Sequence, residues 1–117
     1  MKKILVVDDS RFMRSWLKRL LSDSGYSNII EAENGVNAIR KYKSNSPDLV
    51  IMDITMPVLD GVHALREIML IDGNAKVIMC SSLGQQSLIV ETIKIGAKDF
   101  VVKPYFKNLV PTINNHL

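Results

Sequence analysis

The chain has 117 residues, a net charge of +3 at pH 7 and a single cysteine, Cys80. A chain of this length suits one domain, which we expect to span residues 1–117 and to fold without disulfides. No apolar run reaches the roughly 18 residues of a membrane span, and we find no signal peptide, zinc-finger spacing or RNA-binding aromatic motif, so we expect a cytoplasmic protein without membrane or nucleic-acid partners.

In chain order, short apolar runs alternate with amphipathic stretches. The apolar runs predict strands at residues 4–7, 28–32, 49–52, 76–80 and 100–102. The stretches between them predict five helices. The first is capped by Ser10 and ended by Gly25, and the second is marked by Val36, Ile39 and Tyr42 and stops before Pro47. The third is marked by residues 62–69, the fourth spans residues 87–95 and is ended by Gly96, and the fifth runs from about residue 108 to the C-terminus.

The strand runs are almost continuously apolar, which is typical of strands covered on both faces. Alternating strands and helices therefore predict an α/β fold, a five-stranded parallel sheet with five helices distributed over its two faces. Ligand sites in such sheets form at the carboxyl ends of the strands. The residues that follow each apolar run are therefore the candidates for chemistry.

Carboxylates follow two of the predicted strands. Asp8 and Asp9 follow the first strand, and Asp53 ends the third. Right-handed crossovers make these strands neighbours, so the three carboxylates are expected to share one pocket. Two charges about 4 Å apart repel by about 4 kcal/mol at an effective dielectric constant near 20, and a divalent cation removes this cost. Because the candidate ligands are all oxygens, the cation is expected to be Mg²⁺, or alternatively Mn²⁺, rather than zinc.

Polar residues also follow the fourth and fifth strands. Ser81 and Ser82 follow "KVIMC", and Lys103 follows "DFVV". A metal ion, an ammonium and a hydroxyl around a carboxylate suit phosphoryl transfer to that carboxylate. Taken singly, each residue has an ordinary interpretation, since Asp9 can cap a helix, Ser81 can be a turn residue and a lysine before proline is usually a solvated loop residue. Their placement at the ends of different strands is what those interpretations explain poorly.

Four segments carry a resemblance to a known family: "VVDDS", "MDITMPVLDG", "MCSSLGQQ" and "GAKDFVVKP". Together with the 22 positions from Ser81 to Lys103, they resemble the receiver domains of two-component response regulators, and the resemblance covers the whole chain. Within that family, "MDITMP" and "SSLGQQ" are most similar to single-domain chemotaxis regulators. The resemblance implies a flavodoxin-like sheet with strand order 2-1-3-4-5, for which such regulators are themselves a standard example.

The resemblance also implies a role for the residues at the strand ends. Asp53 is expected to accept the phosphoryl group. Asp8 and Asp9 are expected to bind the metal with Asp53, and the backbone carbonyl of Thr55 to complete the protein ligands. Lys103 is expected to bind the phosphoryl group and to be followed by a cis peptide bond.

Two further residues are implied to switch the protein. Ser81, where many relatives carry threonine, is the implied switch hydroxyl, and Phe100, where tyrosine is common, is the implied switch aromatic. Phosphorylation is implied to draw Ser81 toward the phosphoryl group and to turn Phe100 inward. Thr55 and Leu83 occupy positions that tune the phosphoryl lifetime in relatives.

The family resemblance extends to partners. We expect a docking surface that includes Ile89, Ile93 and Phe100, although periodicity alone favours a broadly buried fourth helix at least as much. The implied partners are a CheA-like histidine kinase and a flagellar switch protein or a phosphatase. We expect a monomer that is not an enzyme, because its only catalysis is its own phosphorylation and dephosphorylation.

Three other interpretations compete with this one. A sporulation-type phosphorelay intermediate, docking through Arg11, Phe12 and Arg14, stays open. A phosphatase of the haloacid dehalogenase class is disfavoured, because that class carries D-x-D where this chain has adjacent aspartates. A flavodoxin-like cofactor binder is disfavoured as well, because "DDSRFM" has no glycine and the wrong charge for a phosphate loop.

Overall fold

Five parallel strands form one sheet in the order β2-β1-β3-β4-β5. The computed structural model describes residues 1–104, 106 and 108–117, and within them the strands alternate with five helices. The strands are β1 (Lys3–Val7), β2 (Asn28–Ala32), β3 (Leu49–Asp53), β4 (Val77–Ser81) and β5 (Asp99–Val102). The helices are α1 (Arg11–Asp23), α2 (Gly35–Asn45), α3 (Gly61–Ile71), α4 (Gln86–Ile95) and α5 (Leu109–His116). Within the described part, none of the helices has the length and apolar character needed to cross a membrane.

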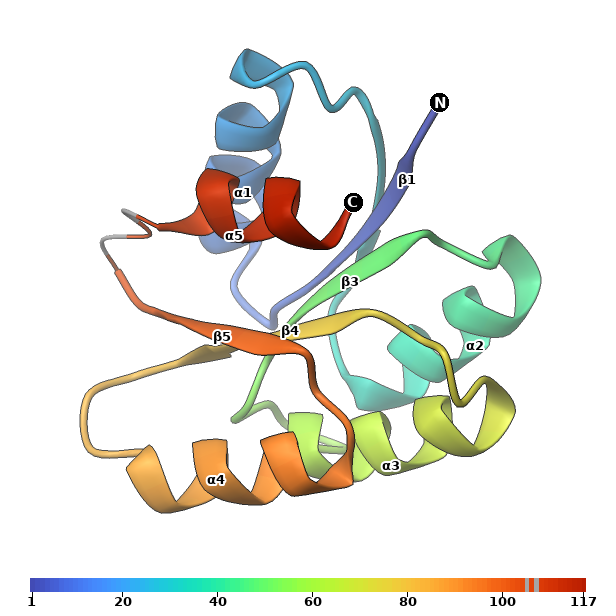
Figure 1. Cartoon of the computed structure of the whole chain (residues 1–117), viewed down its shortest axis with the longest axis vertical. Helices are drawn as coiled ribbons and strands as arrows, with labels where there is room; N and C mark the ends of the chain where they lie inside the picture. The colour runs from blue at the N-terminus through green and yellow to red at the C-terminus, as the bar shows by residue number, and fades with distance from the viewer. Residues whose placement is uncertain (105, 107) are drawn as a thin grey trace.

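The helices cover both faces of the sheet (Figure 1). Helices α1 and α5 lie on one face, where Leu17 and Leu21 of α1 and Leu109 and Ile113 of α5 are buried against alternate strand residues. Helices α2, α3 and α4 lie on the other face, where the remaining strand residues are buried. Because each central strand is covered on both sides, the side chains in its interior are all apolar, and polar side chains occur only at its first or last residue.

The predicted fold class and strand order are confirmed. The strand bounds move by one residue at several ends, because the main-chain pairing continues into the polar residues. Asp53 pairs with Cys80 between β3 and β4, and Ser81 pairs with Val102 between β4 and β5. Two of the candidate site residues therefore belong to the sheet itself and not to flexible loops.

Three helices start with a side-chain cap. Ser10 Oγ accepts a hydrogen bond from the Met13 N–H at 3.2 Å at the start of α1. Asn34 caps α2 and Asp60 caps α3 in the same way, each accepting from the N–H three residues later. Helices α4 and α5 differ, because the side chains of their N-cap residues, Gln85 and Asn108, make no capping hydrogen bond within the described residues.

The chain returns very closely behind the end of β3. The Gly61 N–H donates to the Ile54 carbonyl at 2.7 Å. A Cβ atom at Gly61 would lie 2.1 Å from the carbonyl oxygen of Asp53, which is far inside van der Waals contact. The start of α3 is therefore pressed against the backbone that carries Asp53, and only glycine allows this approach.

We expect Gly61→Ala to lower the free energy of unfolding by about 2–3 kcal/mol, because the added methyl group forces backbone atoms apart. Urea unfolding followed by circular dichroism measures the change. Gly73→Ala is the matched control, since nothing lies within 4 Å of a Cβ atom there. A loss at Gly61 no larger than that at Gly73 would mean that the backbone relaxes without cost.

Candidate functional site

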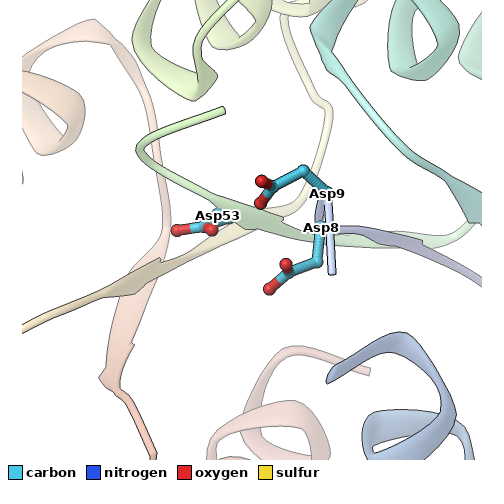
Figure 2. A group of neighbouring side chains, drawn as sticks. All are labelled: Asp8, Asp9 and Asp53. Carbon is cyan, nitrogen blue, oxygen red and sulfur yellow. The ribbon is translucent and has the colours of Figure 1, made fainter. Parts of the chain in front are cut away.

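Three carboxylates meet at the carboxyl end of the sheet (Figure 2). Asp8 and Asp9 follow β1, and Asp53 is the last residue of the neighbouring β3. Each residue offers a carboxylate oxygen, and these oxygens lie within 4.8 Å of one another. Asp8 and Asp53 are buried, with relative exposures of 1% and 5%, whereas Asp9 is exposed. The cluster therefore reaches from the interior to the solvent.

Lys103 directs its ammonium into this cluster. Its Nζ lies 2.7 Å from Asp53 Oδ2, to which it donates a hydrogen bond, and 2.8 Å from Asp8 Oδ2. The contact with Asp8 is an ion pair without the alignment of a hydrogen bond, so Asp8 Oδ2 has no hydrogen-bond partner within residues 1–104, 106 and 108–117. Asp8 Oδ1 accepts from the Ser10 N–H at 2.9 Å. The bond that follows Lys103, to Pro104, is cis, as predicted.

Burial and the paired charges shift two pKa values. Burial raises the pKa of Asp53, Lys103 opposes this shift and Asp8 adds to it, so the pKa of Asp53 lies above its usual value. Burial lowers the pKa of Lys103, but the contacts with Asp53 and Asp8 outweigh it and raise that pKa. Lys103 is therefore charged at neutral pH, and its stabilising contribution is lost only as the pH rises through its elevated pKa.

The donor set fits a hard divalent cation. The candidate ligands of the cluster are all carboxylate oxygens, which Mg²⁺ prefers. One ammonium beside three carboxylates leaves an excess of negative charge, and the buried Asp8 Oδ2 still lacks a hydrogen bond from the described residues. A bound cation would balance the excess negative charge and would give Asp8 Oδ2 a partner.

Ser81 lies beside the cluster at the end of β4. Its side chain is fully buried, and Oγ has no hydrogen-bond partner in the described part of the chain. The Lys103 N–H donates to the Ser81 carbonyl at 2.7 Å, so the backbone holds these two residues together. An unpaired buried hydroxyl costs free energy, which makes Ser81 a candidate donor to a group that is added at Asp53.

Two loops line the open edge of the site. Thr55 lies on the loop after β3, and Leu83, with an exposed fraction of 85%, lies on the loop after β4. The two loops are joined by a contact that the sequence does not predict: Gln85 Nε2 donates to Thr55 Oγ1 at 2.8 Å, and Gln85 Oε1 accepts from the Ser82 N–H at 2.7 Å. The motif "SSLGQQ" contains this glutamine, but side-chain direction in a loop has no sequence signal.

Two of the three predicted docking residues, Ile89 and Phe100, line an apolar groove beside α4 and β5. Phe100 and Ile93 are 41% and 44% exposed, and Ile89 is half-buried against the core. The groove has a volume of about 450 Å³, and Ser81, Ile89, Val90 and Phe100 are among its lining residues. Helix α4 is therefore not broadly buried, and Ser81 connects the acidic cluster to this exposed apolar surface.

The residues of the alternative phosphorelay surface are only partly available. Phe12 is 73% exposed on α1, and Arg11 is exposed as well. Arg14 is engaged, because it donates to the Asp8 carbonyl at 2.8 Å and pairs with Glu31 at 3.1 Å. Arg14 therefore supports the backbone behind the acidic cluster.

Comparison with known proteins gives consistent results. Residues 4–114 match the family model of the response regulator receiver domain. The chain is 55% identical to the chemotaxis protein CheY of Bacillus subtilis over 88% of this chain and 86% of that protein. It is 54% identical to CheY of Thermotoga maritima over 89% of this chain and 87% of that protein.

Solved structures agree with these relatives. CheY in the CheX-CheY-BeF3-Mg²⁺ complex of Borrelia burgdorferi superposes with a TM-score of 0.91 at 38% identity, covering 99% of this chain and 90% of that one. The response regulator TrrA of Thermotoga maritima, in complex with Mg²⁺-BeF, superposes with a TM-score of 0.90 at 36% identity and covers all of both chains.

We expect Lys103→Met to lower the free energy of unfolding by about 2 kcal/mol at neutral pH without Mg²⁺, because Asp8 and Asp53 then face each other without a cation. Saturating Mg²⁺ should shrink this loss. Urea unfolding with EDTA and with Mg²⁺ measures both values. Lys98→Met, at an exposed position, is the control. An equal loss with and without Mg²⁺ would show that Lys103 does not act by balancing the carboxylates.

Proposed function

The chain belongs to the response regulator receiver family, and we propose that Asp53 accepts a phosphoryl group and thereby switches a chemotaxis-type regulator spanning residues 1–117. The observation that carries the proposal is the placement of Asp53, whose carboxylate is held by the Lys103 ammonium at 2.7 Å inside the acidic cluster. Sequence identity of 53–55% to several CheY proteins supports chemotaxis as the setting and disfavours the phosphorelay alternative.

The proposed step is a transfer between two covalent bonds. An oxygen of Asp53 attacks the phosphorus of a phosphohistidine on a CheA-like kinase, the P–N bond breaks and its electron pair stays on the imidazole. Asp8, Asp9, Asp53 and the carbonyl of Thr55 would hold Mg²⁺, with Mn²⁺ as the alternative ion, and the bound cation would neutralise charge on the phosphoryl oxygens. Lys103 would neutralise charge on these oxygens as well, since its ammonium already lies against Asp53.

The proposed switch begins at Ser81. Its buried, unpaired hydroxyl donates to a phosphoryl oxygen on Asp53 and so gains a hydrogen bond to a charged group. Phe100, which is exposed in this structure, turns inward into the space next to Ser81. This movement changes the shape of the surface formed by α4 and β5. Phosphorylation thereby shifts the population toward the conformation that binds a partner.

The proposed partners follow from the relatives. A CheX-CheY complex is known from Borrelia burgdorferi, which supports a protein partner for a regulator of this kind. We propose a flagellar switch protein or a phosphatase as that partner, beside the kinase. Thr55 and Leu83, at the mouth of the site, are proposed to set how fast water hydrolyses the acyl phosphate. We propose that the protein acts as a cytoplasmic monomer with no substrate turnover beyond its own phosphorylation and dephosphorylation.

Acetyl phosphate with Mg²⁺ should add one phosphoryl group to the wild-type protein, because the attack needs only a phosphoryl donor and the assembled site. Intact-mass spectrometry reads the adduct. Asp53→Asn and omission of Mg²⁺ should both abolish it. Asp23→Asn, at the exposed end of α1, is the matched control and should behave as wild type. An adduct that persists in Asp53→Asn would place the acceptor elsewhere.

We expect Ile93→Glu to weaken binding of the phosphorylated protein to a flagellar switch protein by at least about fivefold, because it places a charge on the apolar α4 surface. Binding is measured with immobilised switch protein, and adduct formation should be unchanged. Ile71→Glu, at an equally exposed position at the end of α3, is the control. Unchanged binding by both variants would assign the docking surface to another face.

A further inference from the structure

Gln85 bridges the two loops that flank the open edge of the site. Its Oε1 accepts from the Ser82 N–H at 2.7 Å, and its Nε2 donates to Thr55 Oγ1 at 2.8 Å. A backbone N–H can only donate, so the carbonyl end of the amide must face Ser82 and the NH₂ end must face Thr55. One side chain therefore joins the loop after β3 to the loop after β4.

The bridge does not serve the helix that Gln85 begins. Gln85 is the N-cap residue of α4, where a short side chain such as Ser, Thr, Asn or Asp would cap the helix. Asn34 and Asp60 do this for α2 and α3, while Gln85 makes no capping hydrogen bond in α4. Both ends of its amide hydrogen-bond to the two loops, which indicates a role outside the helix.

The segment that Gln85 holds is the one that the proposed switch has to move. Ser82 directly follows Ser81, whose buried Oγ is unpaired within the described residues. Thr55, at the other end of the bridge, lies two residues after Asp53. If Ser81 approaches a group added at Asp53 with a shift of the backbone at Ser82 relative to Thr55, that shift breaks the two hydrogen bonds of Gln85, which join these two segments.

We propose that Gln85 is a positioning residue that holds the segment after β4 in its unphosphorylated arrangement, so that Ser81 reaches the phosphoryl group as the bridge opens. This inference rests on the proposed role of Asp53. Hydrogen bonds that exist in only one of two states bias the equilibrium toward that state. Removing the bridge therefore raises the population of the state that binds a phosphoryl group.

The test replaces the amide and keeps the size of the side chain. Gln85→Leu should bind beryllofluoride with Mg²⁺ at least about fivefold more tightly than wild type, as expected for the loss of two neutral hydrogen bonds from the resting state. Fluorine NMR measures the dissociation constant, and intact mass should show faster formation of the acetyl phosphate adduct. Thr55→Val, which removes the same bridge from its other end, should shift affinity in the same direction.

The double variant and a neighbouring residue provide the controls. Gln85→Leu combined with Thr55→Val should shift affinity no further than Gln85→Leu alone, because Gln85→Leu already removes the hydrogen bond that Thr55→Val removes. Gln86→Leu, at the exposed next position, should match wild type. Unchanged or weaker beryllofluoride binding by Gln85→Leu, or additive effects in the double variant, would overturn the inference while wild-type phosphorylation stands. A wild-type protein that forms no adduct would instead overturn the proposed function, and this inference with it.

Discussion

The structure depends on an imbalance of charge at the end of the sheet. Two nearly inaccessible carboxylates, Asp8 and Asp53, share the single ammonium of Lys103 at 2.8 and 2.7 Å. Buried charges are tolerated only when they are paired, and Lys103 cannot neutralise both of them together with Asp9. The site is therefore incomplete without a cation, and its net charge responds strongly to any group that arrives. The same imbalance that costs stability makes the site sensitive to a phosphoryl group.

Rigid backbone holds this imbalance in place. The main-chain ladder includes Asp53 and Ser81, and the Lys103 N–H is bonded to the Ser81 carbonyl at 2.7 Å. The close return of the chain at Gly61 supports Asp53 from behind. These residues have little freedom to relieve their repulsion by moving apart. The segments that can change conformation are the loops after β3 and β4, which have few main-chain hydrogen bonds. There the side chain of Gln85 restrains the chain instead.

Much of this arrangement could be predicted from the sequence, for identifiable reasons. Apolar runs directly precede Asp8, Asp53 and Lys103. Parallel strands bring the positions after such runs to one edge of the sheet, independently of the loop conformations. The same logic does not reach Gln85 or the pairing of Arg14 with Glu31, because long side chains in loops and on helix surfaces choose their partners by geometry that no periodicity encodes. The exposure of Phe100 is different: the family resemblance already placed this residue on a docking surface, and the position of β5 at the sheet edge accounts for its 41% exposure.

The energies involved suit a reversible switch. Moving an equilibrium from almost entirely one state to almost entirely the other takes about 5.5 kcal/mol of differential binding. A buried hydroxyl without a partner, such as that of Ser81, costs about 1–3 kcal/mol, and a hydrogen bond to a charged group contributes about 1.5–3 kcal/mol. In the proposed switch, Ser81 therefore supplies a large part of that difference, while the hydrogen bonds of Gln85 oppose it in the resting protein. These two opposed contributions would keep the resting state populated and still allow one phosphoryl group to overturn it.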